Sequence, residues 1–227
     1  MTFTNDTRTI VIGGTSGIGK AVASALARRP GSVATASRST GLDVTDQAAV
    51  AAYFEAQSPV DHVVFTAGSA APGGAVTDVS IDAAKQAFDT KFWGAIATAG
   101  AATKHIRPGG SITLTSGFLA RRTVPGTYVK TAMNAGIEAV AKILAKELAP
   151  IRVNVISPGL TDTEAHAGMD AEARQTMLDR AAGSLPAGKA GAPEDLAQGY
   201  LFAIDNAFVT GAVIDIDIDI DGGALIN

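Results

Sequence analysis

The stretch Thr9-Ile10-Val11-Ile12-Gly13-Gly14-Thr15-Ser16-Gly17-Ile18-Gly19-Lys20 decides how the chain folds. Its apolar first part is typical of a buried strand, and the glycines that follow allow a tight turn and a close approach of the backbone to a ligand. The alanine-rich residues 21–27 are typical of a helix that packs on a sheet. Because the free N–H groups of that helix point toward the glycines, the stretch predicts a pyrophosphate site. Taken alone, it also fits an ordinary turn between a strand and a helix.

The composition restricts the class of protein. The chain has 227 residues, of which 47% are hydrophobic and 18% charged, and it contains no cysteine. These values suit one α/β domain over residues 1–227 and exclude disulfides and thiolate catalysis. No apolar run reaches the roughly 18 residues of a membrane span, and residues 1–6 lack a signal-peptide pattern. With a net charge of −4 and no basic cluster, we expect a cytoplasmic protein that binds neither nucleic acid nor membrane.

Predicted strands and helices alternate along the chain. The expected strands are 9–12, 32–36, 61–68, 110–116, 151–156 and 212–220, and the expected later helices are 48–57, 82–105, 127–148 and 193–205. Alternation indicates a parallel sheet with helices on both faces and ligands at the carboxyl ends of its strands. Residues 160–190 are polar and rich in alanine and glycine, which favours a lid or substrate loop; a surface excursion without a ligand role also fits.

The end of the second predicted strand favours one cofactor. Ser37 and Arg38 stand where a carboxylate would hold the ribose hydroxyls of NAD. A guanidinium can bind a 2′-phosphate through two hydrogen bonds, and no acidic residue stands beside it. The pair therefore predicts NADP(H), unless Arg38 is a solvated loop arginine.

Residues 214–221 repeat the dipeptide Ile-Asp four times. The period of two places all the isoleucines on one face of a strand and all the aspartates on the other. Carboxylates can bind a divalent cation, but such ligands usually converge from a curved loop. We therefore expect a core strand with one wetted face and no metal site.

Several motifs together resemble the short-chain dehydrogenase/reductase family from end to end. They are the glycine motif 13–19, Asp43-Val44, Thr66-Ala67-Gly68, residues 146–159, residues 191–195 and Gly222-Gly223. The resemblance implies a single doubly wound Rossmann-type domain with a parallel seven-stranded sheet and helices on both faces. It also implies NADP(H), a small-molecule substrate, and assembly as a homotetramer or homodimer.

The resemblance further implies the residues that contact the cofactor, from the glycine motif at the pyrophosphate to the acidic pair at the adenine. The expected set is Gly13, Thr15, Ser16, Gly17, Ile18, Gly19, Ser37, Arg38, Asp43, Val44, Ala67, Gly68, Pro158, Gly159, Leu160 and Thr161.

The residues that carry the family's chemistry are replaced in this chain. The family works through an asparagine, a serine, a tyrosine and a lysine. Counting back from the signature that begins at Lys146, the tyrosine falls on Lys130 and the lysine on Asn134. Lys91 stands where the asparagine belongs, and Gly117 where the serine belongs.

Two further hydroxyl groups lie near these positions. Ser116 precedes the expected serine by one residue, and Tyr128 is the only tyrosine nearby. Since the ordinary pKa values of lysine and tyrosine are about 10.4 and about 10, Lys130 could act as the acid. Lys130 and Asn134 lie four residues apart, so they share a helix face. The candidate catalytic set is Lys130, Lys91, Ser116, Asn134 and Tyr128, each of which could instead be solvated or structural.

Two functions explain intact glycines beside altered catalytic positions. The first is an NADP(H)-dependent oxidoreductase that transfers hydride to or from a small carbonyl or alcohol through a lysine-containing site. The alternative is an NADP(H)-binding protein without hydride transfer, serving as a sensor or assembly partner. A lyase or dehalogenase that needs no cofactor is disfavoured, because the glycine turn and Arg38 remain.

Overall fold

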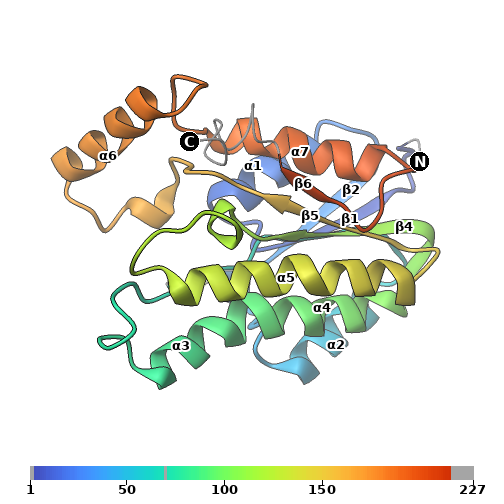
Figure 1. Cartoon of the computed structure of the whole chain (residues 1–227). Coiled ribbons are helices and arrows are strands. Elements are labelled where there is room, and N and C mark those ends of the chain that lie inside the picture. The colour runs from blue at the N-terminus through green and yellow to red at the C-terminus, as the bar shows by residue number, and fades with distance from the viewer. Residues whose placement is uncertain (1–2, 69–70, 216–227) are drawn as a thin grey trace.

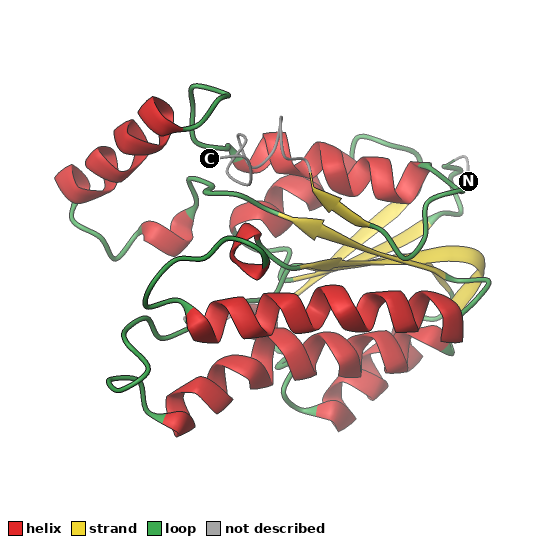
Figure 2. Ribbon diagram, viewed as in Figure 1, coloured by secondary structure: helices red, strands yellow, loops and turns green. Residues whose placement is uncertain are grey.

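Six parallel strands form the centre of the fold, in the order β2-β1-β3-β4-β5-β6. They are β1 (Arg8–Ile12), β2 (Ser32–Ala36), β3 (Val60–Phe65), β4 (Ile106–Thr115), β5 (Arg152–Ser157) and β6 (Val213–Asp215). The computed structural model describes residues 3–68 and 71–215, and it places the sheet between two layers of helices (Figures 1 and 2). This is the doubly wound α/β fold that the alternating pattern predicts.

Two apolar cores hold the layers together. On one face, α1 (Gly17–Leu26) and α7 (Pro193–Asp205) pack on the sheet, with Val11, Val64 and Tyr200 fully buried between them. On the other face lie α2 (Gln47–Gln57), α4 (Gly94–Thr103) and α5 (Tyr128–Glu147), as Figure 1 shows. Because strand side chains alternate between faces, Ile10 and Ile12 join this second core.

The described residues form six strands, where we predict seven. Only residues 37–46 separate β2 from α2. A crossover to another parallel strand needs about a dozen residues or more, so this segment holds a short 3-10 turn (Arg38–Thr40) and β2 remains an edge strand. The predicted last strand is described only as β6, and residues 216–221 of the Ile-Asp repeat, with Gly222-Gly223, lie outside the described residues.

The helix predicted over residues 82–105 is present, but it contains an irregularity that the sequence does not predict. The segment divides into α3 (Ile81–Phe88), a π-helical turn (Asp89–Trp93) and α4. Two glycines allow the turn to pack closely: a Cβ on Gly94 would lie 2.7 Å from Val44 Cγ2, and one on Gly136 would lie 2.9 Å from the Phe92 ring. Turns of this kind often occur at functional sites, and this one carries Lys91.

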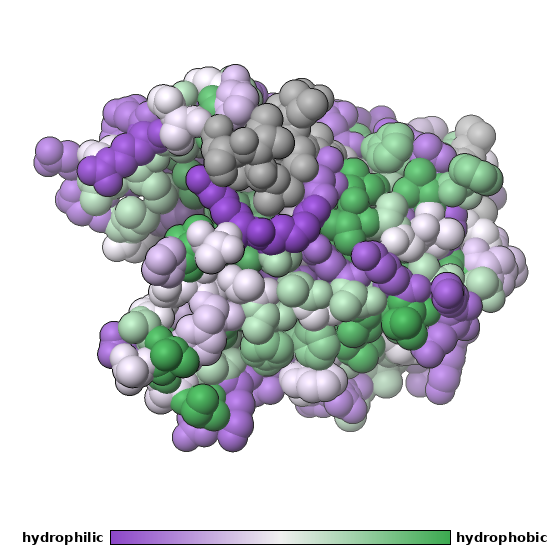
Figure 3. Space-filling view, in the orientation of Figure 1, coloured by the Kyte–Doolittle hydropathy of each residue, from purple (hydrophilic) through white to green (hydrophobic). Residues whose placement is uncertain are grey.

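The segment 160–190 contains a helix that the sequence does not predict, α6 (Ala171–Ser184), which stands away from the sheet (Figure 1). Arg174 ties it back through a hydrogen bond of 2.5 Å to Asp162 Oδ1. The surface is hollowed between this segment and the elements below it (Figure 3). Within residues 3–68 and 71–215, no helix combines the length and the apolar character needed to cross a membrane.

Substituting Gly19 tests how closely α1 must approach the glycine turn. A Cβ on Gly19 would lie 2.3 Å from both Gly13 O and Thr66 Oγ1, so Gly19→Ala must displace backbone. We expect a loss of about 3 kcal/mol in the free energy of unfolding, measured by urea titration. Gly100→Ala is the control, because nothing lies within 4 Å of the added Cβ. It should stabilise the protein by about 0.5 kcal/mol, and equal losses in both variants would contradict this packing.

Candidate active site

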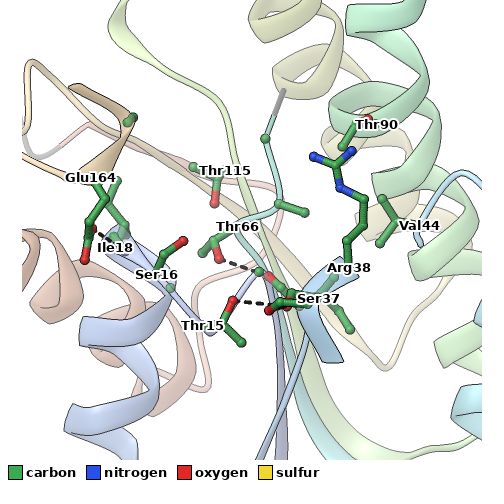
Figure 4. A pocket seen from close by; sticks show the side chains of 18 of the residues that line it. Thr15, Ser16, Ile18, Ser37, Arg38, Val44, Thr66, Thr90, Thr115 and Glu164 are labelled. Atoms are coloured by element: carbon green, nitrogen blue, oxygen red, sulfur yellow. Dashed lines mark hydrogen bonds between the residues drawn. The ribbon is translucent and has the colours of Figure 1, made fainter. Parts of the chain in front are cut away.

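A cleft of about 700 Å³ lies at the carboxyl ends of β1, β2 and β3 (Figure 4). Every cofactor contact that we predict between Gly13 and Gly68 lines it. Further lining residues that the sequence reasoning missed are Ile12, Ser39, Leu42, Thr66, Thr90, Thr115, Thr163, Glu164 and Ala165. Most of them are adjacent in the chain to predicted residues, so extending each predicted motif by one residue would have found them.

Backbone hydrogen bonds shape the glycine turn at the floor of the cleft. The Gly13 N–H donates to Ala36 O at 2.7 Å, and the Thr66 hydroxyl donates to Ile12 O at 2.9 Å. Gly13 has a φ of +82°, and a Cβ there would lie 2.6 Å from Ala67 N. Only glycine fits this conformation without strain, so the motif is required by the geometry of the turn.

The N-terminus of α1 already binds a carboxylate. Glu164 Oε2 accepts a hydrogen bond of 2.8 Å from the Gly17 N–H, and both residues line the cleft (Figure 4). Hydrogen bonds from the Glu164 N–H and the Gly17 N–H lower the pKa of Glu164, and the charges of Lys20 and Arg174 lower it further. The helix end therefore stabilises a negative charge at the place predicted for a pyrophosphate.

Hydroxyl groups and one guanidinium surround the end of β2. The Thr15 hydroxyl donates to Ser37 Oγ at 3.0 Å, and Ser37 Oγ lies 2.8 Å from Ser39 Oγ. The Arg38 side chain extends across the cleft toward Thr90 (Figure 4). Donors of this kind, with no carboxylate among the three residues that follow β2, suit a phosphate group.

Asp43 and Val44 form the side of the cleft beyond β2. Asp43 Oδ1 accepts hydrogen bonds from the Thr45 N–H at 2.9 Å and from the Thr45 hydroxyl at 2.8 Å. These two bonds are the main reason why the pKa of Asp43 is lowered, and Arg38 lowers it further. The pair is therefore held in a fixed position with its carboxylate ionised.

Lys91 and Lys130, here called the lysine cluster, lie beside the cleft. The Lys91 ammonium, carried by the π-helical turn, donates to Ser116 O at 2.8 Å and to Asn134 Oδ1 at 2.6 Å. Its chain neighbour Thr90 and the neighbour of Ser116, Thr115, both line the cleft. Burial lowers the pKa of Lys91 to about 8, and the charge of Lys130 contributes to the shift. Lys91 can therefore exchange a proton near neutral pH.

Lys130 and Asn134 lie on one face of α5, as their spacing predicts. Asn134 is 5% exposed and directs its carbonyl oxygen at Lys91. Lys130 lies close enough for its charge to act on Lys91, and it forms no hydrogen bond or ion pair with any other residue in the described ranges. Two ammonium groups thus lie within electrostatic reach of each other, one bound by two acceptors and one without a hydrogen-bond acceptor in the described chain.

The two predicted hydroxyl groups point elsewhere. The Ser116 hydroxyl donates to Glu138 Oε1 at 2.9 Å, away from the cleft, so only the Ser116 carbonyl meets the lysine cluster. Tyr128 lines a second cavity of about 420 Å³, together with Val124 and Gly126. The structure therefore joins Lys91, Ser116 and Asn134 by direct contacts and leaves Tyr128 apart.

The four predicted contacts after β5 lie just outside the cleft: Pro158, Gly159, Leu160 and Thr161 are not among its lining residues. Pro158 O accepts the Phe118 N–H at 3.0 Å, and Thr161 pairs with Gly191, so other parts of the chain already engage this segment. The segment 160–190 contributes to the cleft two residues later, through residues 163–165. In the described part of the chain, no group of three or more His, Asp or Glu side chains could hold a metal ion.

The fold and the cleft define a doubly wound nucleotide-binding protein. A family model described as Enoyl-(Acyl carrier protein) reductase matches residues 35–223. The short-chain dehydrogenase/reductase ucsE of Acremonium sp is 31% identical, over 96% of this chain and 94% of its own length. The chain belongs to the short-chain dehydrogenase/reductase family, a family of oxidoreductases, as its motifs predict.

Two further relatives are informative. The cis-4-hydroxycyclohexanecarboxylate dehydrogenase of Sinomonas cyclohexanicum is 30% identical, over 92% of this chain and 94% of its own length. A solved structure described as the crystal structure of a small-chain dehydrogenase in complex with NADPH has 54% sequence identity to this chain. The two structures superpose with a TM-score of 0.94, over 98% of this chain and 100% of that one.

The lowered pKa of Lys91 predicts how stability depends on pH. The folded value of about 8 lies below the unfolded value of 10.5, so the unfolded chain binds more protons between these pH values. The free energy of unfolding should therefore rise with pH across this window, by up to about 3 kcal/mol from Lys91.

Urea titrations of the native protein and of Lys91→Met at intervals from pH 7.5 to 10.5 measure this contribution. The rise should be absent from Lys91→Met and retained in Lys104→Met, the control at an exposed lysine. Identical pH dependence in all three proteins would show that Lys91 titrates normally.

Proposed function

We propose that the protein is an NADP(H)-dependent oxidoreductase that transfers hydride to or from a small carbonyl or alcohol, with lysines in place of the family's usual acid. The observation that carries this proposal is the hydrogen bond of 2.6 Å between Lys91 and Asn134 at the edge of the cleft. The solved relative that binds NADPH supports the choice of cofactor.

The residues of the cleft fit this cofactor. The α1 N-terminus would hold the pyrophosphate in the place where Glu164 now lies, which requires the lid residues to move away from Gly17. Arg38, with the hydroxyls of Ser37 and Ser39, would hold the 2′-phosphate. When bound, NADPH supplies the hydride, and the protein must supply the proton and the orientation.

The lysine and the asparagine are exchanged relative to the family pattern. Lys91 stands at the family's asparagine position and Asn134 at its lysine position, yet their side chains meet. The ammonium is thus delivered by the π-helical turn instead of α5. Gly117, at the family's serine position, is compatible with this exchange because it leaves room for the Asn134 side chain. A Cβ at position 117 would lie 3.0 Å from Asn134 Nδ2. Three mutually compatible changes support retained chemistry over simple loss of the site.

Lys130 is the proposed proton donor. Its ammonium would give a proton to the carbonyl oxygen as the carbonyl carbon receives hydride, and would regain a proton from solvent. In the oxidative direction, the neutral amine would accept the proton of the alcohol. Lys91 would act beside it, since its hydrogen bonds to Ser116 O and Asn134 Oδ1 fix a second ammonium near the reacting oxygen.

A second function, NADP(H) binding without hydride transfer, is favoured by one observation. The hydroxyls of Ser116 and Tyr128, the two that could assist proton transfer, do not point into the cleft. Such a protein would bind the cofactor and oxidise none of it, serving as a sensor or assembly partner.

We further propose a homotetramer or homodimer, as the family resemblance implies, and a cytoplasmic protein in which residues 160–190 act as a lid. Trp93 and Ile143 expose 56% and 54% of their surface, on the π-helical turn and on α5. Burial of these side chains against another copy would fit such an assembly.

Cofactor preference tests the role of Arg38. We expect Arg38→Ala to weaken NADPH binding about 30-fold and to leave NADH binding nearly unchanged, because only NADPH carries the 2′-phosphate. Titration calorimetry with both dinucleotides measures this. Arg28→Ala removes an exposed arginine beyond the C-terminal end of α1, outside the cleft, and should change neither value. Equal losses for NADPH and NADH would contradict a 2′-phosphate contact.

Turnover tests the proposed chemistry. NADPH oxidation is followed by nicotinamide absorbance with a panel of aldehydes, ketones and quinones. We expect turnover by the native protein, a loss of at least about 100-fold in kcat for Lys130→Met and for Lys91→Met, and no loss for the exposed Lys146→Met. Tight NADPH binding without oxidation across the panel would favour the second function, and full activity of Lys130→Met would exclude that residue as the acid.

A further inference from the structure

A buried carboxylate lies behind the lysine cluster. Glu138 on α5 is 9% exposed, and its Oε1 accepts the Ser116 hydroxyl at 2.9 Å. Arg121 Nη2 lies 3.4 Å from the same oxygen. A carboxylate is costly to bury unless its partners replace the lost hydration. The proton transfer proposed above makes no use of this group, so its presence needs another explanation.

Ser116 connects Glu138 to Lys91. Its hydroxyl donates to Glu138, its carbonyl accepts from Lys91 at 2.8 Å, and its N–H donates to Ile156 O at 2.9 Å. Ser116 is 3% exposed, so no alternative partner is available from solvent. All of its polar groups are therefore engaged, with the hydroxyl directed at Glu138 and the carbonyl directed at Lys91.

Helix α5 therefore reaches Lys91 by two routes. Asn134 contacts it directly at 2.6 Å, and Glu138, one helical turn further on the same face, reaches it through Ser116. Arg121 extends the network to Ser157 Oγ at 3.1 Å and to Asp215, so the ends of β5 and β6 are joined to the same carboxylate.

We propose that Glu138 is a positioning residue that holds the Ser116 hydroxyl and thereby fixes the carbonyl to which the Lys91 ammonium binds. The inference rests on the proposed function, in which Lys91 acts at the reacting centre. The charged groups that face Glu138 are Arg121, Asp215 and Lys142, and the charged group that faces Lys91 is Lys130.

The test measures the protonation of Lys91 without a substrate. The pH dependence of unfolding is determined for Glu138→Ala, Ser116→Ala and the double variant, each compared with its Lys91→Met counterpart. A carbonyl acceptor favours the charged ammonium, so its displacement should lower the titration midpoint of Lys91 by about one pH unit in each single variant. The double variant should show no larger shift than either single variant, because both substitutions remove the same hydrogen bond, the one between Ser116 and Glu138. Glu147→Ala, at the exposed end of α5, should show none.

Glu138→Gln separates position from charge. The amide oxygen still accepts the Ser116 hydroxyl, so the midpoint of Lys91 should stay at its native value, whereas a role of the charge would shift it. The proposal is overturned if Glu138→Ala lowers the melting temperature but leaves the Lys91 midpoint unchanged, or if the two single shifts add. If Glu138→Ala does not fold, Ser116→Ala carries the same test.

Kinetics provide the second readout. With any carbonyl that the native protein reduces, Glu138→Ala and Ser116→Ala should each lower kcat about tenfold and leave the affinity for NADPH unchanged. A native kcat in Glu138→Ala would also overturn the proposal. Absence of turnover in the native protein would count against the proposed function alone, since the Lys91 midpoint is measured without turnover.

Discussion

The charge-assisted hydrogen bond from Lys91 to Asn134 is the interaction on which the candidate site depends. It joins the π-helical turn to α5 across a distance of 2.6 Å and holds an ammonium group where burial disfavours the charged form. Retaining that ammonium requires acceptors, and the structure supplies two, Asn134 Oδ1 and Ser116 O. The close fit of Phe92 against Gly136 brings the two helices near enough for this contact.

The cleft depends on a second constraint: the backbone N–H groups at the N-terminus of α1 need hydrogen-bond acceptors. Gly17 donates to Glu164 in this structure, and an incoming pyrophosphate would make the same hydrogen bond with more charge. A pyrophosphate bound there would displace Glu164, so the Gly17 N–H would link cofactor binding to the position of the proposed lid. The lysine cluster lies on the neighbouring edge of the same cleft, where Thr90 and Thr115 form part of the lining.

The sequence predicts the fold and many of the residues that line the cleft, because both depend on local signals. Glycines at Gly13, Gly17 and Gly19 follow directly from the geometry of the turn, and each lines the cleft. The π-helical turn at Asp89–Trp93 was not predicted, since it arises from packing between segments far apart in the chain. The direction of the Ser116 hydroxyl depends on Glu138, 22 residues away, and no local pattern reports it. Alignment with the family's motifs places Lys91 at the asparagine position and Asn134 at the lysine position. Only the structure shows that the two side chains are in contact.

The most direct test of this account is the reciprocal exchange Lys91→Asn with Asn134→Lys, assayed by NADPH oxidation. If the site needs one ammonium and one amide facing each other, each single substitution should lower kcat at least about 100-fold, because it leaves two amides or two ammonium groups in contact. The double variant should then recover to within about tenfold of the native kcat, with the lysine delivered from α5 instead of the π-helical turn. A double variant no more active than the single variants would contradict the claim that the pair acts as an exchanged unit.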